Sequence, residues 1–384
     1  MEQEFHNCLK LLLVLINDLY SVFAKTNVLA IVAIMVSAFT VYPAFALGTP
    51  TTADLFYTTF SGTPNVHKVH ASWDGTTFSL GAPTDLASTE GADGIIFAPD
   101  GDLLVAGQNL GTINKVHLSP LSITIKSAGS GTPASPQCYH ESLDPSKMFV
   151  WCGGDYTGGT PFSIGKVPLS PFADGTGNPI SGDDPAVDSL AFVGTTAYYT
   201  QSFPPGVGDF GTIDLTTFVT HRIIASLPAA HGMIFDSFTG DLILCGATQV
   251  TQIIPGANVI ISTFTGPVTG PYDQCAADGK GHLYVASNDG TLTFIDYSIS
   301  HLVGTPDYTT SPFLAASLDD IAPIAGLGGV GGGPSSPVGG QIIPIDMTAL
   351  FVVGIMTSAF WMIPTAGGIA GAALVLYKVK RKHV

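Results

Sequence analysis

A pattern that recurs about every 45 residues constrains this chain more than any other feature of its sequence. Between residues 50 and 325, short apolar segments begin 48, 45, 49, 45 and 41 positions apart. They are LFYTTF (55–60), LLVAG (103–107), MFVWCG (148–153), AYYTQ (197–201), LILCG (242–246) and LYVAS (283–287). A period in the forties with about four strands per repeat is typical of β-propeller blades. A β-sandwich spaces its turns more closely and has no longer repeat. We therefore expect an all-β, six-bladed propeller.

The two ends of the repeat region predict how the ring closes. Residues 91–118 show a full unit, in which Ile95–Phe97 is the first strand and Leu103–Ala106 the second. The chain's first repeat starts at a second strand, Asp54–Phe60, whereas Leu318–Ile324 is a first strand without a second. Pairing these two segments would complete the sixth blade and remove an exposed sheet edge.

The charge balance excludes one class of partner. The net charge is −16 at pH 7, and four of the 13 basic residues lie in the last seven positions, so the central region is more acidic than the average. A nucleic-acid partner is therefore not expected. The acidity fits solubility, a cation or a basic partner.

The N-terminal 46 residues predict a leader. Residues 28–46 are apolar, follow Lys25 and end in the small-x-small pattern Ala44-Phe45-Ala46, which suits a signal peptidase. We expect cleavage after Ala46. Because residues 11–16 are apolar as well, an upstream start codon or an uncleaved N-terminal anchor is the alternative.

The C-terminal part predicts a membrane anchor. Residues 326–346 form a Gly/Pro/Ser-rich linker, 347–377 an apolar segment and 378–384 a basic tail. The best spanning window is 358–377, with Trp361 and Tyr377 near its ends. Since basic residues stay in the cytoplasm, we expect a single-pass protein of the cell membrane with the propeller (47–325) outside.

Candidate site residues stand at the predicted starts of the first strands, which converge on one mouth of a propeller's central channel. They are Asp93, His140, Glu141, Asp188, His231, Asp273 and Asp319, with Gln274 and Asp320 beside them. Such a ring could bind Ca²⁺ through carboxylate oxygens, or a softer metal if the histidines take part. The alternative is a ring of solvated polar caps on strand ends.

Four of the five cysteines lie in the repeat region, and an even number in a secreted domain suggests disulfides. Cys138 opens one predicted strand and Cys152 closes the next, so we expect these two to face each other in a hairpin and form a bond. Cys245 and Cys275 are the second expected pair. A copper or zinc cluster of cysteines with His140 and His231 is the rival interpretation, although no C-x-x-C or H-x₃-H spacing occurs.

The segments GADGIIFAPDGDLLVAG and CAADGKGHLYVASNDGTLTFIDY resemble six-bladed propellers of the gluconolactonase-like, NHL-repeat and streptogramin-lyase-like families. Gluconolactonase-like enzymes hold a divalent cation with Glu, Asn and Asp. Here Asp273 or Asp319 matches the Asp, but no Asn stands at a strand start. Streptogramin-lyase-like enzymes use a His and Glu pair, for which His231 matches the His without a following Glu. The tail TSAFWMIPTAGGIAGAALVLYKVKRK looks like tails of surface proteins of ammonia-oxidising archaea, which implies an archaeal envelope.

We expect a non-enzymatic function, and an enzymatic one is the alternative. The first is a non-enzymatic surface module whose propeller binds an envelope protein, a glycan or another extracellular ligand. The second is a metal-dependent lactonase, hydrolase or lyase with its site at the channel mouth. The sequence contains no P-loop, G-x-S-x-G or H-E-x-x-H motif. Fold alone does not decide, because propellers host both functions.

Overall fold

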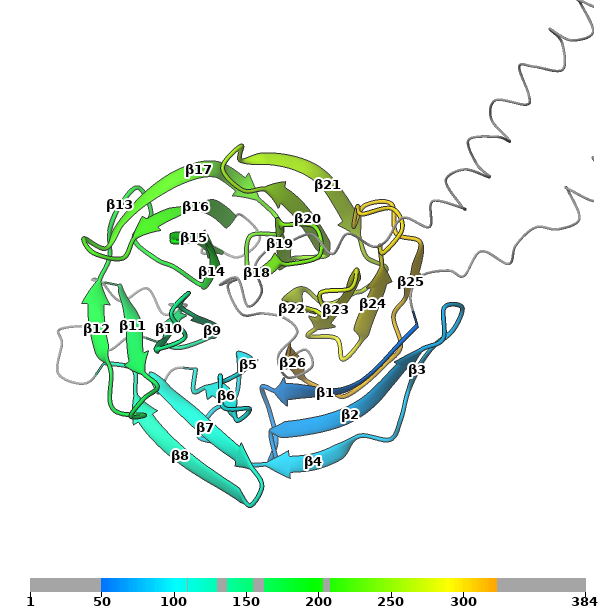
Figure 1. Cartoon of the computed structure of the whole chain (residues 1–384), viewed down its shortest axis with the longest axis horizontal. Coiled ribbons are helices and arrows are strands. Elements are labelled where there is room, and N and C mark those ends of the chain that lie inside the picture. Colours follow the sequence, from blue (N-terminus) through cyan, green and yellow to red (C-terminus); the bar gives the residue numbers. More distant parts are fainter. Residues whose placement is uncertain (1–49, 109, 130–136, 155–161, 203–207, 323–384) are drawn as a thin grey trace, which may run out of the picture. The chain divides into compact units, whose positions relative to one another are not determined.

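The computed structural model describes residues 50–108, 110–129, 137–154, 162–202 and 208–322, which form six β-sheets. Figure 1 shows the sheets arranged around a common centre as the blades of a propeller. The six-bladed fold expected from the repeat is therefore confirmed. The expected leader, linker, transmembrane segment and basic tail lie outside the described residues. Within the described ranges, no helix has the length and apolar character needed to cross a membrane.

Blade 1 combines strands from both ends of the propeller sequence, and blades 2 and 3 are each built from consecutive strands. Blade 1 contains β1 (Thr51–Thr59), β2 (Val66–Trp73), β3 (Phe78–Leu80), β4 (Thr84–Ala87) and β26 (Leu318–Ala322). Blade 2 contains β5 (Ile95–Phe97), β6 (Leu103–Ala106), β7 (Thr112–Leu118) and β8 (Leu121–Ser127). Blade 3 contains β9 (His140–Leu143), β10 (Phe149–Gly153), β11 (Ser163–Pro168) and β12 (Thr176–Pro179).

The other three blades follow in chain order. Blade 4 contains β13 (Ser181–Gly182), β14 (Ser189–Val193), β15 (Thr196–Gln201), β16 (Gly208–Asp214) and β17 (Val219–Leu227). Blade 5 contains β18 (Gly232–Asp236), β19 (Asp241–Gly246), β20 (Gln249–Ile254) and β21 (Val259–Thr265). Blade 6 contains β22 (Tyr272–Ala277), β23 (His282–Ser287), β24 (Leu292–Asp296) and β25 (Tyr308–Thr310). The inner strands β26, β5, β9, β14, β18 and β22 surround the centre (Figure 1).

Ring closure occurs as the sequence predicts. Strand β26 pairs antiparallel with β1, with Tyr57 opposite Ile321 and Phe56 opposite Ala322. Both Tyr57 and Ile321 are buried in the core between blades 1 and 6. The innermost strand of blade 1 therefore comes from the far end of the propeller sequence.

The hydrophobic core is divided among the junctions between neighbouring blades. Trp73 and Leu55 of blade 1 pack with Phe294 of blade 6, and Trp151 of blade 3 packs in one cluster with Tyr199 of blade 4. Four further clusters join the remaining neighbours. Successive side chains of a strand point to opposite faces of the blade, and each face packs against a neighbouring blade. The stability of the closed ring therefore depends on all the junctions.

Both expected disulfides are present, Cys138–Cys152 and Cys245–Cys275. The expected register of the first pair is wrong, because Cys152 lies opposite Glu141 and not Cys138. Cys138 precedes β9 and forms a β-bridge with Gln108 of blade 2. The copper or zinc cluster of cysteines is excluded because all four sulfur atoms are used in disulfides.

Candidate metal centre at the propeller axis

The candidate residues lie at the N-terminal ends of the inner strands, as the sequence predicts for a channel mouth. Asp188 and His231 directly precede β14 and β18, His140 opens β9, and Asp273 is the second residue of β22. Their side chains are buried rather than solvated: Asp188 and His140 are each 1% exposed. The alternative of solvated strand caps therefore does not describe these residues, and their charges need partners.

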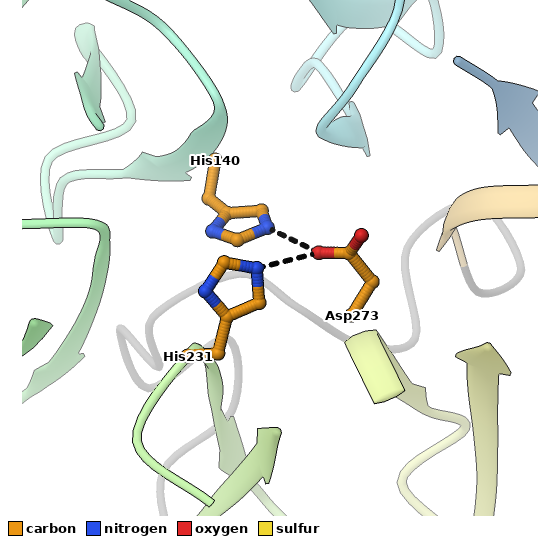
Figure 2. A group of neighbouring side chains, drawn as sticks. All are labelled: His140, His231 and Asp273. Atoms are coloured by element: carbon orange, nitrogen blue, oxygen red, sulfur yellow. Dashed lines mark hydrogen bonds and ion pairs between the residues drawn. The ribbon is translucent and has the colours of Figure 1, made fainter. Parts of the chain in front are cut away.

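Two histidines and one carboxylate meet at the axis. Nε2 of His140 lies 3.2 Å from Oδ1 of Asp273, and Nε2 of His231 lies 2.8 Å from the same oxygen. Figure 2 shows the two imidazoles side by side and directed at Asp273. They come from blades 3, 5 and 6, so the cluster exists only in the closed ring.

A second group shares two of these residues. Asp93, His140, Asp273 and Asp320 each offer one ligand atom, and these four atoms lie within 4.8 Å of one another. Nε2 of His140 is 3.8 Å from Asp93 Oδ1 and 3.7 Å from Asp320 Oδ2. The distances from His140 Nε2 to the three carboxylates, 3.2, 3.8 and 3.7 Å, are of the size found between ligand atoms of one metal ion, since each bond is about 2.0–2.3 Å long.

Several polar atoms in this group lack protein partners within the described ranges. Asp320 is fully buried, and neither of its carboxylate oxygens has a hydrogen-bond partner. The same is true of Oδ2 of Asp319 and Nδ1 of His140. Buried polar groups are nearly always satisfied by protein, water or an ion. The Asp320 carboxylate, which has no hydrogen-bond partner and lies close to His140, therefore points to an ion or water as its partner.

Electrostatics separates Asp273 and Asp188, whose pKa values are lowered, from the other acids of the axis. Burial alone would raise the pKa of Asp273, but the charge of His231 and hydrogen bonds from both histidines hold it well below its usual range. Burial also opposes a charge on His231, yet Asp273 and Asp188 outweigh it and raise the His231 pKa to about 10. Asp273 and His231 thus form a buried ion pair.

In three further acids of the axis the effect of burial prevails. Burial raises the pKa of Asp93, Asp319 and Asp320 well above the usual range, and the neighbouring carboxylates raise it further. In contrast to Asp273, these groups cannot all carry a negative charge unless a cation lies among them.

Asp188 supports the site from blade 4. Its Oδ2 accepts a hydrogen bond from the backbone N–H of Ser202 and lies 3.9 Å from Nδ1 of His231. Nδ1 of His231 is also 3.0 Å from the Ser202 hydroxyl. These contacts orient the His231 ring so that Nε2 faces Asp273.

Glu141, although adjacent to His140, points in a different direction. A Cβ added to Gly94 of the neighbouring blade would lie 2.1 Å from Oε2 of Glu141. The blade 5–6 junction repeats this arrangement, where a Cβ on Gly232 would lie 2.3 Å from Oε1 of Gln274. Glu141 therefore occupies the place that a neutral amide fills elsewhere in the ring, and burial raises its pKa well above the usual range.

Asn288 is a site residue that the sequence analysis missed. Its amide nitrogen donates to Oδ2 of Asp273 at 2.8 Å and lies 3.5 Å from Oδ1 of Asp319. The predicted candidates all stand at the starts of first strands, whereas Asn288 directly follows the second strand, β23. In an antiparallel pair these positions share one end, so the residues after second strands could have been included.

A pocket of about 590 Å³ opens beside the cluster. Asp93, His231, Asp273 and Asn288 line it together with more apolar groups, among them Tyr139 and Tyr272. Its size is in the range of small-molecule sites. Because Asp93 and Asp273 belong to both the cluster and the pocket lining, a cation held by the cluster would be accessible to a bound ligand.

The sequence matches no family model and no curated protein. Solved structures share the propeller fold. A catalytically inactive virginiamycin B lyase from Staphylococcus aureus with quinupristin is 10% identical, with 69% of this chain and 89% of that chain covered and a TM-score of 0.44. A streptogramin B lyase is 13% identical (71% and 91% covered, TM-score 0.45), and the calcium-binding protein regucalcin from Agrobacterium tumefaciens is 12% identical (60% and 77%, 0.43). At these identities the likeness concerns the fold alone.

The pairing of Glu141 with Gly94 generates a prediction. Glu141→Gln should change the free energy of unfolding at pH 7 by less than about 1 kcal/mol, because an amide occupies the equivalent junction at Gln274. Glu141→Ala should cost about 2–4 kcal/mol, since it leaves a cavity at a blade junction. Urea unfolding followed by circular dichroism measures both. Equal losses in the two variants would contradict the assignment of Glu141 as a neutral packing group.

Proposed function

We propose that this propeller binds a divalent cation at its axis and a small ligand in the adjoining pocket. One observation carries the proposal: the fully buried, unpartnered Asp320 carboxylate lies within ligand-sharing distance of Asp93, His140 and Asp273. A cation there would neutralise carboxylates that burial otherwise keeps protonated.

The donor set favours a transition metal of the Zn²⁺ or Mn²⁺ kind over Ca²⁺. Ca²⁺ takes six to eight oxygen ligands, whereas one imidazole nitrogen with three carboxylates suits Zn²⁺, Mn²⁺ or Fe²⁺. His231 would then support the ligand Asp273 through its 2.8 Å hydrogen bond. The Ca²⁺ ion expected from the acidic ring becomes the second choice because His140 lies inside the group.

If the site binds a metal, the purified protein should contain that metal and should become more stable when it is added. The dialysed protein should retain a single ion per chain in elemental analysis. Adding Zn²⁺ or Mn²⁺ at 100 times its Kd should stabilise the metal-free protein by about 2.7 kcal/mol. Asp320→Asn should raise the Kd for the metal at least ~10-fold, because removing even a residue that only supports a ligand has an effect of this size. Asp85→Asn is the control, since Asp85 is exposed and lies on β4, which does not pair with an inner strand. Unchanged binding in Asp320→Asn would refute the site.

Metal-assisted hydrolysis or elimination is a second candidate function. It is favoured by His231, which lines the pocket beside the cluster and could exchange a proton with a bound ligand. The protein loaded with Zn²⁺ or Mn²⁺ should then turn over lactone or ester probes, and Asp320→Asn should reduce the rate at a fixed metal concentration. If the loaded protein binds metal but turns over none of these probes, the binding role stands alone.

We also propose that the propeller is held on the outer face of a cell membrane, in an archaeal envelope, by residues 347–377. The apolar segment and the basic residues after it support this, and two disulfides fit an oxidising compartment outside the cytoplasm. The full chain should fractionate with membranes, and protease added to intact cells should remove the propeller. A chain ending at residue 325 should be released. Recovery of the full chain in the soluble fraction would oppose the proposal.

A further inference from the structure

The Cys245–Cys275 disulfide crosses the junction at which His231 meets Asp273. Cys245 belongs to β19 of blade 5 and Cys275 to β22 of blade 6, and both are buried in the core that joins these blades. Their Cα atoms are 6.1 Å apart. The bond therefore links two separate sheets, whereas most of the ring is joined by packing alone.

Each end of this disulfide lies close in register to a site residue. Cys245 is opposite Gly232, the residue directly after His231. Cys275 is two residues beyond Asp273. The backbones approach closely here, since a Cβ on Gly232 would lie 2.5 Å from the carbonyl oxygen of Asp273. A change in the spacing of the two blades would therefore change the distance between the His231 and Asp273 side chains.

Asp273 needs this support because it lies in a β-bulge. Tyr272 is opposite Ser287 and Cys275 is opposite Val285, so three steps on β22 match two steps on β23. Asp273 and Gln274 thus lack regular partners in the ladder. A bulge redirects a side chain but leaves the extra residues less firmly held. The bulge is held on one side by the hydrogen bond from Tyr272 N–H to Ala247 and on the other by the disulfide at Cys275.

The other disulfide is not needed for positioning in this way. His140 has a regular ladder partner, Gly153, within its own blade. The backbone N–H of Tyr139 donates to the Gly153 carbonyl at 2.8 Å. These ladder contacts fix His140 without the Cys138–Cys152 bond. The two disulfides therefore differ in what they constrain: Cys138–Cys152 ties the segment just ahead of β9 to β10, the strand that follows it, and the other joins the two blades that supply His231 and Asp273.

We propose that the Cys245–Cys275 disulfide is a positioning element of the axial cation site, which it serves by holding the Asp273 bulge against blade 5. This inference rests on the proposed metal-binding function. Loss of the disulfide would remove none of the candidate metal ligands. It would, however, let Asp273 move relative to His231, His140 and Asp93. Metal affinity should then depend on this disulfide and not on the other one.

The experiment compares matched pairs of cysteine substitutions in the full chain. Cys245→Ala with Cys275→Ala should raise the Kd for Co²⁺ by about tenfold or more and alter its visible absorption, which reports coordination geometry. Cys138→Ala with Cys152→Ala should leave the Kd within about twofold of the native value, since its ladder contacts remain. Calorimetric titration gives the affinities, and circular dichroism gives the melting temperature of each protein. A second variant, Cys245→Val with Cys275→Ala, fills more of the space that the sulfur atoms leave.

The outcomes separate this inference from the metal site itself. If the native protein binds no Co²⁺, Zn²⁺ or Mn²⁺, the proposed function fails. If the native protein binds and both double variants at 245 and 275 bind equally well with the native spectrum, only the positioning role is refuted. Equal weakening by the control pair also refutes it, because the effect would then follow general stability. Loss of the fold in both variants would overturn it too, since the bond would be required for the ring rather than for the site.

Discussion

The pairing of β26 with β1 is the interaction on which the rest of the structure depends. It closes the ring, and it also brings Asp320 from near the end of the propeller sequence to Asp93 near its beginning. Thr58 of β1 connects the two directly: its hydroxyl accepts a hydrogen bond from the Asp320 N–H at 3.0 Å and donates to the Asp93 carbonyl at 2.6 Å. Closure of the fold and assembly of the candidate site are therefore the same event.

The axis and the blade junctions have opposite roles in stability. The junctions bury aromatic and aliphatic side chains, which favours folding by roughly 25 cal/mol for each Å² of apolar surface removed from water. The axis buries carboxylates, which opposes folding unless they are protonated, paired or bound to a cation. Among the described acids of the axis, Asp273 and Asp188 lie beside the charged His231, which lowers the pKa of both against the effect of burial. The cost of burying Asp93, Asp319 and Asp320 without such a partner is consistent with selection for binding rather than for stability.

The sequence predicted the architecture better than the site, for a physical reason. The spacing of the repeats predicts the number of blades, and the apolar runs predict the second strands and the pairing that closes the ring. These features depend only on the course of the backbone and on which segments are buried. Side-chain direction within a strand depends on alternation, so His140 reaches the axis whereas its neighbour Glu141 packs at Gly94. The bulge that directs Asp273 and the turn that presents Asn288 have no unambiguous pattern in a single sequence. Composition could identify a set of candidates, but only the register of strands could separate ligands from packing groups.

The distribution of the four candidate ligands suggests how binding and folding are coupled. Asp320, Asp93, His140 and Asp273 come from blades 1, 2, 3 and 6, so a cation at their centre would cross-link four of the six sheets. Three of these blades are consecutive, and blade 6 adjoins blade 1, which places the closure seam inside the linked set. A cation that binds only the closed ring must stabilise closure by the same free energy with which closure favours binding. The β1–β26 pairing, whose ladder is short and irregular between Tyr57 and Thr59, is the element that gains most from this coupling. A cation at the proposed site would thus help to hold the ring closed as well as mark the place where a ligand would bind.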